Sequence, residues 1–584
     1  MFLQHDPLKN LATSALSPLL KKLGVEWSTS EIYGALGPTP NREMGHMAFA
    51  CFKLAKDMKK SPAQVSTELS ALVAELPEGI AQIKSAGPYL NLFFDTGVIA
   101  KNLLPQILSG DLFKTALTKD SPKTMVEYSQ PNTHKEMHVG HMRNLCLGSA
   151  IIETMRYAGF DIISSTFPGD VGTHVAKCLW YMKKYNTEQP PKERKGAWLG
   201  QMYSKAHNLL EDQRGTDKEE SNRLELTAIL KQLEKKEGEY YDLWKETRQW
   251  SIDLMNDVYK WAHVKFDQWY WESEVDSDSL KLVMEYYDKG LFKKDEGAIG
   301  CDLSEDKLGF CLLVKSDGNG LYATKDIELA RRKFQDFKIQ KSIYVVDKRQ
   351  ALHFAQVFKV LEKMGFEEAK DCFHLQYDFV ELPDGPMSSR KGNIIPIQAL
   401  IEQMQEMIKT DYLGKYIGQW SEQEINETAE IVSVGAIKYG MTRVDTNKKI
   451  VFDMKEWLKL DGESGPYIQY VYARIQSLLE KQGRIGANTP DLSKLSHPLE
   501  GQLVQKLLEF NSVVEFAVLH NKTIPITAYL YDVAKMFNSF YAELSVANAE
   551  TPELKKARLG LCESTALTLK QGLKLLGIPS PKRM

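Results

Sequence analysis

The spacing of hydrophobic and polar positions along the chain changes twice. In residues 1–117, apolar residues recur at helical spacing in three segments, 7–23, 46–57 and 61–76. The segment GPYLNLFFD at 87–95 alternates instead, as a strand does. A last helical pattern and a polar linker at 109–123 follow. We therefore predict a small α+β module at the N-terminus.

From residue 118 to 393, short apolar runs alternate with segments of helical period. This order is typical of a doubly wound, Rossmann-like parallel sheet, in which a crossover helix follows each strand. Such sheets bind their ligands at the carboxyl ends of the strands, where the strand order reverses. At about 184–264 a stretch rich in Lys, Glu and Leu interrupts the alternation, and we predict a helical insertion there.

Residues 394–584 have helical period almost throughout, which predicts an all-α bundle. The length of 584 residues is too great for a single core and agrees with several units. The predicted fold is thus multidomain α/β: a small α+β N-terminal domain, a doubly wound parallel-sheet domain with a helical insertion, and a helical C-terminal bundle.

Composition narrows the class of protein only slightly. Hydrophobic residues make up 43% and charged residues 26% of the chain, as in ordinary globular proteins, and no apolar run reaches membrane-spanning length. The N-terminus lacks the pattern of a signal peptide, and the seven Cys residues are scattered without a C-x-x-C pair. We therefore expect a cytoplasmic protein with reduced thiols and no protein-held metal.

Net charge does not indicate a nucleic-acid partner, because it is only −3 at pH 7. The last segment, 551–584, contains seven Lys or Arg and two Asp or Glu, which gives a local charge of +5. RNA binding can depend on such patches, but helix faces are also often basic for solubility. The patch permits an RNA partner without requiring one.

The strongest candidate for chemistry is the segment MVEYSQPNTHKEMHVGHMRN at 125–144. A strand pattern leads through a polar turn to a helix that begins near His138, and a helix N-terminus offers free N–H groups and a positive dipole end to an anion. His138 and His141 could donate hydrogen bonds to charge that grows during phosphoryl chemistry, and Gly140 lets a flat base lie against the backbone. Alone, this H-x-G-H pattern could equally hold a metal ion or cap the helix.

A second segment, PMSSRKGN at 386–393, decides between these alternatives. Its Ser, Arg, Lys and Gly residues make a compact cationic loop suited to a polyphosphate. Together the segments resemble the HIGH and KMSKS signatures of class I aminoacyl-tRNA synthetases, and the surrounding residues resemble the arginyl-tRNA synthetase family. The resemblance implies ATP with Mg²⁺, L-arginine and tRNA(Arg) as substrates and partners, and we expect a monomer.

By the same resemblance, the arginine site has two ends. Tyr322 and Asp326, four residues apart and so on one helix face, correspond with Gln350 to the guanidinium end. Glu127 and Asn132 correspond to the end near the α-amino group. A carboxylate suits a guanidinium because it accepts paired N–H donors and rejects lysine on geometry. Without the resemblance, Asp326 could equally complement a helix dipole.

The resemblance also implies the residues that hold ATP, drawn from both segments and from the helix after Gln350: Ser129, His138, Gly140, His141, His353, Met387, Ser388, Arg390 and Lys391. The expected catalytic residues are Lys135, His138, His141, Ser388, Ser389 and Lys391. Their donors and cations would stabilise the pyrophosphate as it leaves. Ser389 stands where KMSKS has its central Lys, and Lys135 matches the upstream Lys that many family members carry instead.

Some positions depart from the family pattern: His134, Glu136, Phe167, Val171 and His174. Glu136 is expected to place an anion close to the triphosphate, which weakens binding unless Lys135 or Mg²⁺ offsets it. These departures leave the level of activity open.

The resemblance implies RNA contacts from both ends of the chain: Tyr89, Asn91, Tyr467, Tyr470, Arg474 and Met584. Unstacked RNA bases stack on aromatic rings and on Arg, which suits these residue types. An ordinary amphipathic strand would explain Tyr89 and Asn91 equally well, and helix core would explain Tyr467 and Tyr470.

The implied activity is that of an arginine–tRNA ligase. Such an enzyme forms arginyl-adenylate from L-arginine and ATP, then transfers arginine to the 3′ end of tRNA(Arg) and releases AMP and pyrophosphate. Two alternatives remain open from the sequence, a non-catalytic tRNA-binding relative and another nucleotidyltransferase that uses H-x-G-H. The second would leave the C-terminal helices unexplained.

Overall fold

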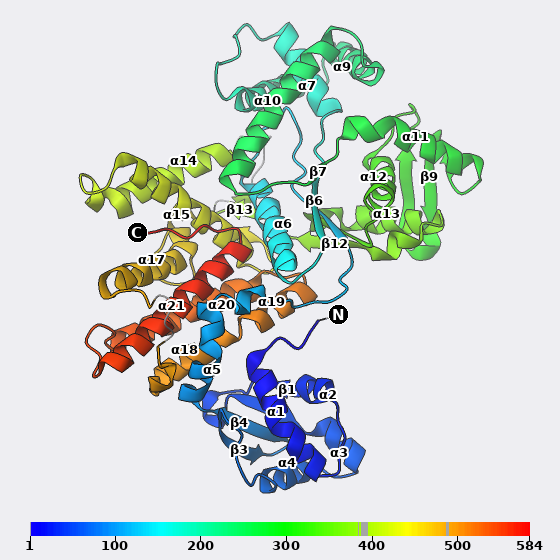
Figure 1. The fold of residues 1–584 in the computed structure, drawn as a ribbon. Coiled ribbons are helices and arrows are strands. Elements are labelled where there is room, and N and C mark those ends of the chain that lie inside the picture. The colour runs from blue at the N-terminus through cyan, green and yellow to red at the C-terminus, as the bar shows by residue number, and fades with distance from the viewer. Residues whose placement is uncertain (1, 384, 387–394, 486–489) are drawn as a thin grey trace.

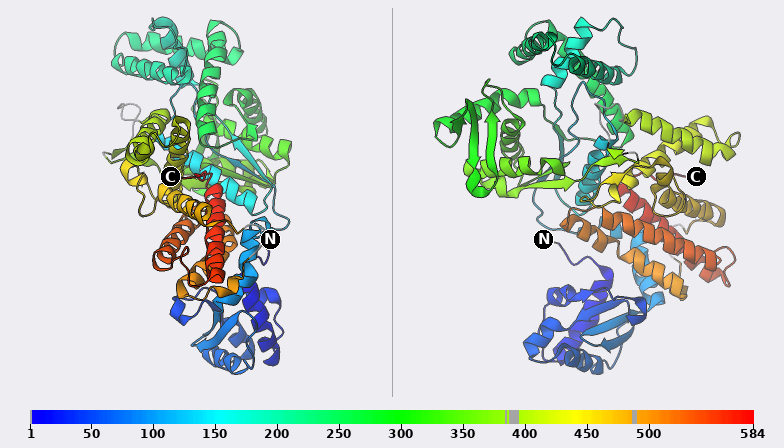
Figure 2. Two further views of the ribbon diagram at one scale, coloured as in Figure 1. Left: turned by 60° about the vertical axis from the view of Figure 1, so that its left-hand side comes forward. Right: turned by 180° about the vertical axis from the view of Figure 1, so that it is seen from behind.

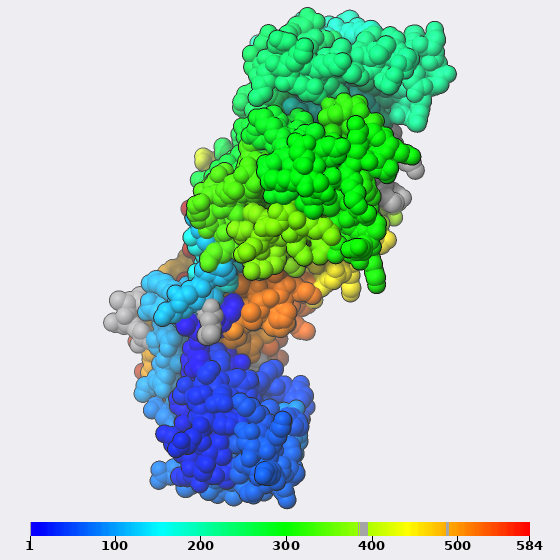
Figure 3. All heavy atoms as spheres, turned by 90° about the vertical axis from the view of Figure 1, so that its right-hand side faces the viewer, coloured from blue at the N-terminus to red at the C-terminus, as the bar shows by residue number. Residues whose placement is uncertain are grey.

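The computed structural model describes residues 2–383, 385–386, 395–485 and 490–584. The N-terminal module and the helical insertion lie at opposite ends of an elongated molecule, with the parallel sheet and the C-terminal helices beside each other between them (Figures 1 and 2). The space-filling view in Figure 3 shows the same long outline. The predicted multidomain α/β architecture is confirmed.

The N-terminal module packs helices against an antiparallel sheet of order β1-β2-β4-β3. Its elements are α1 (Pro7–Lys22), α2 (Thr29–Gly34), β1 (Leu36–Gly37), β2 (Met47–Ala50), α3 (Phe52–Met58), α4 (Pro62–Ala71), β3 (Ile80–Ala86), β4 (Tyr89–Phe94) and α5 (Thr96–Leu108). The helix predicted for 46–57 is wrong in its first half, where β2 pairs with β4. Met47 and Phe49 are buried on one face of that strand, and this pairing overrides the helical spacing.

The central sheet has the order β12-β11-β5-β6-β7, and its neighbouring strands are parallel. Its strands are β5 (Thr124–Glu127), β6 (Ile162–Thr166), β7 (Gln268–Trp269), β11 (Lys341–Asp347) and β12 (Cys372–Tyr377). The chain proceeds from β5 to β6 and β7 on one side, and later adds β11 and β12 on the other side of β5. The strand order therefore reverses between β5 and β11, where such a sheet binds its ligands.

Helix α6 (Val139–Tyr157) follows β5 and lies close against it. A Cβ atom at Gly148 would lie 2.3 Å from the ring of Tyr128, so the approach requires glycine. This packing fixes the N-terminus of α6 at the carboxyl edge of the sheet.

Two further units interrupt the alternation of strands and helices. The predicted insertion is helical: it follows α7 (Thr173–Lys184) and consists of α8 (Lys195–Asp212), α9 (Lys218–Lys235) and α10 (Glu239–Trp261). Residues 297–324 contain a hairpin that forms a separate antiparallel sheet with one more strand. That unit contains α11 (Glu272–Asp288), β8 (Lys293–Asp295), β9 (Ala298–Leu303), β10 (Gly309–Val314), α12 (Tyr322–Phe337) and α13 (Ala351–Lys363).

A small sheet of order β14-β13-β15 joins the parallel-sheet domain to the bundle. Its strands are β13 (Val380–Leu382), β14 (Gly385–Pro386) and β15 (Ile450–Val451). The bundle comprises α14 (Ile397–Ile408), α15 (Glu422–Thr442), α16 (Met454–Trp457), α17 (Gly465–Gln482), α18 (Pro498–Leu508), α19 (Phe510–Leu519), α20 (Ile524–Glu543) and α21 (Pro552–Leu575). Throughout the described ranges, no helix is both long and apolar enough to cross a membrane.

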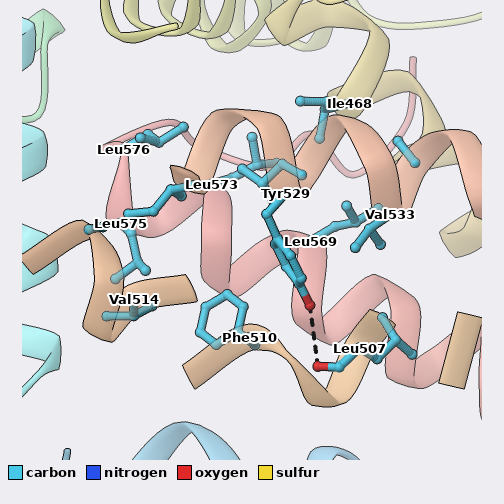
Figure 4. Close-up of a cluster of buried hydrophobic side chains, with 14 of the residues drawn as sticks. Ile468, Leu507, Phe510, Val514, Tyr529, Val533, Leu569, Leu573, Leu575 and Leu576 are labelled. Atoms are coloured by element: carbon cyan, nitrogen blue, oxygen red, sulfur yellow. Dashed lines mark hydrogen bonds between the residues drawn. The ribbon is translucent and has the colours of Figure 1, made fainter. Parts of the chain in front are cut away.

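The bundle is held by a continuous apolar core. Figure 4 shows Phe510, Leu569 and Leu573 packed around Tyr529, whose hydroxyl donates to the Leu507 carbonyl at 3.2 Å, so the one polar atom buried there is satisfied. Helix α5 packs on α18 and α21 and attaches the N-terminal module to this bundle.

Candidate active site

A cavity of about 650 Å³ lies at the carboxyl ends of β5 and β11, where the strand order reverses. Its walls include many of the residues predicted for ATP and arginine: Glu127, Ser129, Asn132, His138, Gly140, His141, Tyr322, Asp326, Gln350 and His353. These residues come from segments up to about 220 residues apart in sequence, and the fold brings them to one hollow. The volume is within the range of ordinary ligand sites.

At one end of the cavity, the two histidines of H-x-G-H form the first turn of α6. His138 is the N-cap, and its Nδ1 accepts the Gly140 N–H at 3.1 Å. The Nδ1 of His141 accepts the His138 N–H, also at 3.1 Å. Because each Nδ1 is an acceptor, each neutral ring carries its proton on Nε2 and is a donor there.

Burial keeps both rings uncharged. It lowers the pKa of His138 to about 4, with a smaller contribution from the Lys135 charge, and it lowers the pKa of His141 well below its ordinary value. The ring centroids are 4.0 Å apart. This end of the cavity thus offers neutral N–H donors and a helix N-terminus to an anion, and the arrangement contains no metal-type cluster: among the described residues no such group of three His, Cys, Asp or Glu side chains occurs.

The second motif lies mostly outside the described residues, including Met387, Ser388, Ser389, Arg390 and Lys391. Both of its flanks are described. Before it, β14 pairs with β13. After it, the Ile395 carbonyl accepts the Val139 N–H at 3.1 Å, and the Ile397 N–H donates to the Met137 carbonyl at 3.0 Å. The chain that follows the motif is therefore hydrogen-bonded through its backbone to the start of α6.

The opposite end of the cavity is acidic. The Asp326 carboxylate pairs with His353 Nε2 at 2.5 Å. Burial alone would lower the pKa of His353, but the hydrogen bond and charge of Asp326 outweigh it and raise that pKa. Tyr322 is 67% exposed at the rim, and Gln350 is exposed at the start of α13. His353, expected among the residues that hold ATP, is thus paired with Asp326, which was expected at the guanidinium end.

Glu272, which the sequence analysis did not single out, is the second carboxylate of the acidic end. It is 7% exposed, lines the cavity, and has Lys325 Nζ 3.6 Å away. Burial raises the pKa of Glu272 to about 7 although Lys325 acts in the opposite direction. It follows the insertion at the start of α11, among several acidic residues typical of a helix N-terminus, so its sequence context gave no signal.

Between the two ends, Glu127 is buried and already paired. Its carboxylate forms an ion pair with Lys333, a fully buried residue of α12, and accepts from Gln130 Nε2 at 3.2 Å. Asn132 is bridged to Gly169 and lies beside it in the wall. Lys333 was not anticipated, because a Lys in an amphipathic helix is most often exposed.

Ser129, predicted to hold ATP, and Lys135, predicted to be catalytic, have other contacts. Ser129 is 3% exposed; its N–H donates to Asn144 Oδ1 at 2.6 Å, and its hydroxyl lies 3.1 Å from the Tyr259 hydroxyl. Lys135 is not in the cavity wall, and its ammonium lies 4.9 Å from the centroid of the Tyr203 ring in α8. Burial lowers the pKa of Lys135.

The positions that depart from the family pattern are mostly explained by packing on the insertion. His134 is fully buried, with Nε2 2.8 Å from Thr247 Oγ1 in α10. Val171 packs with the apolar residues of α7 and α10, and His174 Nε2 lies 3.2 Å from the Gly169 carbonyl. Phe167 lines the cavity.

Glu136 lies in the wall of a second cavity, of about 1160 Å³, between the insertion and α14. Its Cβ is next to Gly200 of α8, where a Cβ atom would come within 2.7 Å. Contrary to the expectation that it lies close to the triphosphate, Glu136 is not among the residues that line the cavity with His138 and His141.

The residues expected to contact RNA lie in two places. In the N-terminal module, Tyr89 is 39% exposed and packs edge to face on the exposed Phe52, with ring centroids 5.6 Å apart. Asn91 is buried, and its amide donates to the Met44 carbonyl at 2.7 Å, while its Oδ1 has no partner.

In the bundle, Tyr467 accepts from Asn538 Nδ2 at 2.9 Å, and the Arg474 guanidinium lies 4.5 Å from the Tyr541 ring centroid. Tyr470 is partly exposed on the same helix, α17. The C-terminal Met584 is held near the start of α15, where its carbonyl accepts the Tyr416 hydroxyl at 3.3 Å.

Comparisons with known proteins agree with this geometry. Three family models match the chain: "tRNA synthetases class I (R), catalytic domain" over residues 103–454, "DALR anticodon binding domain" over 468–584, and "Arginyl tRNA synthetase N terminal domain" over 8–94. The chain is 56% identical, over the full length of both proteins, to an arginine–tRNA ligase of Bdellovibrio bacteriovorus. It is 35% identical to one of Clostridium botulinum over 93% of this chain and 95% of that protein.

The fold is similar to that of the solved Thermus thermophilus arginyl-tRNA synthetase, with a TM-score of 0.79, 26% identity, and coverage of 99% of this chain and 100% of that one. The resemblance inferred from the two motifs is confirmed by these matches. The chain belongs to the arginyl-tRNA synthetase family of class I aminoacyl-tRNA synthetases.

Proposed function

We propose that this protein is an arginine–tRNA ligase that carries out both steps in and beside the cavity described above. The observation that supports this most is that one hollow joins the neutral donors of His138 and His141 to the carboxylates of Asp326 and Glu272. The first end suits a polyphosphate and the second a guanidinium. The arginine carboxylate and the α-phosphorus of ATP would then meet between them.

In the first step, a carboxylate oxygen of arginine attacks the α-phosphorus of ATP, and the bond to the bridging oxygen of pyrophosphate breaks. The Nε2–H groups of His138 and His141 donate to the phosphate oxygens as charge develops on them, and Gly140 leaves room for the adenine. We assign Ser129 to the support of the turn. Lys135, Ser388, Ser389 and Lys391 act on the leaving pyrophosphate, with Met387, Arg390 and Lys391 over the nucleotide.

The guanidinium of arginine binds between Asp326 and Glu272 and replaces His353 as the partner of Asp326. Tyr322 closes over it from the rim, and Gln350 contacts its far side. A permanently charged, planar guanidinium can bond both carboxylates at once, whereas a lysine ammonium cannot match that geometry.

Glu127 and Asn132 hold the α-amino group near the reacting carboxylate. Lys333 shares the charge of Glu127, so this carboxylate orients the amino group more than it neutralises it. No protein nucleophile is needed, because positioning and charge stabilisation supply the rate.

In the second step, a ribose hydroxyl of the terminal adenosine of tRNA(Arg) attacks the arginyl carbonyl, and AMP leaves. The RNA contacts come from Tyr89 in the N-terminal module and from Tyr467, Tyr470, Arg474 and Met584 in the bundle. Asn91, also predicted to contact RNA, is buried with its amide on the Met44 carbonyl, so we assign it to the support of the strand that carries Tyr89. Exposed Tyr89 with Phe52, and Arg474 stacked on Tyr541, are surfaces on which unpaired bases can stack.

We further propose a domain division of 1–117, 118–393 and 394–584, and a cytoplasmic monomer. Mg²⁺ enters with ATP as the MgATP complex, held by the phosphates of the nucleotide.

Exchange of labelled pyrophosphate into ATP, measured with several amino acids and with and without tRNA, tests the proposal. Exchange that requires arginine, together with charging of tRNA(Arg), is the expected result. Binding of tRNA without any exchange would indicate a non-catalytic relative, and exchange with a substrate other than an amino acid would indicate another nucleotidyltransferase.

A further inference from the structure

Arg143 has contacts that the proposed chemistry does not use. It lies two residues after His141 on α6 and is 1% exposed. Burial lowers its pKa to about 10, so the guanidinium remains charged at neutral pH. A charge buried so completely requires hydrogen-bond partners, and these partners show which segments of the chain Arg143 joins.

The guanidinium bonds backbone carbonyls from two distant segments. Nη1 donates to Asp378 O at 2.6 Å and to Lys448 O at 2.7 Å, and Nη2 donates to Asp445 O at 2.9 Å. Asp378 directly follows β12 of the central sheet, and Asp445 and Lys448 lie after α15 of the bundle. Asp378 N–H also donates to Thr446 O at 2.8 Å. Arg143 thus joins the H-x-G-H helix to the place where sheet and bundle meet.

The bundle holds the same segment, residues 442–448, from the other side. Lys522 Nζ lies 3.1 Å from Asp445 Oδ2, and the Thr523 hydroxyl donates to the Thr442 carbonyl at 2.7 Å. Lys522 and Thr523 immediately precede α20. Helix α20 also carries Asn538 and Tyr541, the partners of the proposed RNA contacts Tyr467 and Arg474. A single helix therefore runs from the proposed RNA surface to segment 442–448.

We propose that Arg143 is a positioning residue for adenylate formation, which fixes the first turn of α6 against segment 442–448 while α20 holds that segment in place. The inference rests on the proposed function, since it concerns ATP at H-x-G-H and RNA at the bundle. RNA bound at α20 then affects the positions of His138 and His141 through the backbone of segment 442–448, to which Arg143 is hydrogen-bonded. The coupling requires no contact between RNA and Arg143.

The test compares Lys522→Met with Lys506→Met in the full-length protein. Both substitutions remove a bundle ion pair of 3.1 Å, Lys522 with Asp445 and Lys506 with Asp532, but only Lys522 contacts segment 442–448. We expect Lys522→Met to slow tRNA-supported arginyl-adenylate formation about fivefold to tenfold, with tRNA affinity within about twofold of wild type, as for a small misplacement of reacting groups. Lys506→Met is expected to leave the rate unchanged.

Arg143→Lys tests the three hydrogen bonds to backbone carbonyls directly, because lysine keeps the charge but cannot bond three carbonyls in a fixed plane. We expect a loss of about 100-fold in the rate of adenylate formation, with KM for ATP and arginine changed less than about threefold. A purely structural role would instead lower the melting temperature and leave the rate per folded molecule unchanged.

Equal rates for Lys522→Met and Lys506→Met would overturn the inference, and so would a loss explained by weaker tRNA binding. The Lys522 comparison remains decisive if Arg143→Lys fails to fold. Wild-type protein is measured beside both variants. If the wild type shows no arginine-dependent exchange, the proposed function fails and the inference fails with it. If the wild type is active and the two variants have equal rates, only the inference is refuted.

Discussion

The two ends of the cavity solve the problem of buried charge in opposite ways. At the end that we propose for ATP, burial removes the charge: His138 and His141 are neutral donors held by backbone N–H groups. At the end that we propose for arginine, Asp326 pairs with His353, whose pKa the carboxylate raises. Neutral donors that bind an anion need no counter-charge before it arrives. Buried carboxylates that bind a cation need another partner until the cationic substrate replaces it.

This comparison predicts different losses when each end is altered. At the ATP end, His141→Ala removes a donor that acts on developing charge, so adenylate formation should slow about 10²- to 10³-fold while KM for ATP changes little. Single-turnover kinetics with saturating arginine measure both quantities. His141→Asn, which can still accept the His138 N–H, controls for loss of the helix cap. Equal losses in rate and in ATP binding would show that the donor does not favour the transition state.

At the arginine end, Asp326→Asn should weaken arginine binding about 30-fold or more, because it leaves a buried guanidinium without one of its charged partners. Affinity for tRNA should stay near wild type. Asp278→Asn is the matched control. Asp278, in α11, pairs with Arg332 of α12, the helix that also carries Asp326, but Asp278 does not line the cavity. If calorimetry gives wild-type arginine affinity for Asp326→Asn, this carboxylate does not belong to the pocket.

The ends should also respond differently to pH. Burial raises the pKa of Glu272 to about 7, so this residue is protonated below that pH and, in the proposed pocket, has to lose its proton to bind arginine. Protonation of His353, whose pKa Asp326 raises, also favours its pairing with Asp326 and so opposes arginine binding. Arginine affinity should therefore fall as pH falls, by up to about tenfold per unit below pH 7.

Calorimetry from pH 8 to pH 6 measures this dependence, and Glu272→Gln should flatten it. ATP affinity should not follow the same curve, because His138 stays neutral until about pH 4. A pH profile of arginine affinity that is flat in the wild type would contradict the assignment of Glu272.

The smallest effect should come from outside the cavity. Tyr89→Ala removes an exposed ring from the N-terminal module and should raise KM for tRNA about fivefold, the lower limit for loss of one stacked base. Arginine and ATP affinities should not change, since Tyr89 is not in the cavity wall. An altered arginine affinity in this variant would mean that the two regions are not independent.

The sequence was sufficient for what depends on local pattern. Alternation of strands and helices gave the parallel sheet, and the four-residue spacing of Tyr322 and Asp326 put both on one face of α12. It failed where distant segments decide. Met47–Ala50 has helical spacing but pairs as β2, and Glu272 resembles a helix-start acid until the fold brings it beside Asp326.

Direction of side chains was the other limit. Glu136 and Lys135 were both expected near the triphosphate, yet both contact α8 of the insertion: Glu136 lies against Gly200, and the Lys135 ammonium lies over the Tyr203 ring. Asn91 lies two residues after Tyr89, on the polar side of the alternating pattern, where a surface residue is expected. Its amide is nevertheless buried against the Met44 carbonyl. Such outcomes depend on space available in neighbouring elements, which spacing along one element does not encode.

The central claim is that one cavity holds ATP at its histidine end and arginine at its carboxylate end. A crystal structure of the protein with a non-hydrolysable sulfamoyl analogue of arginyl-adenylate tests it most directly. The account predicts the guanidinium within hydrogen-bonding distance of Asp326 and Glu272, His353 displaced, and the adenosine beside Gly140. An analogue bound elsewhere, or in this cavity with its guanidinium turned toward His138, would contradict it.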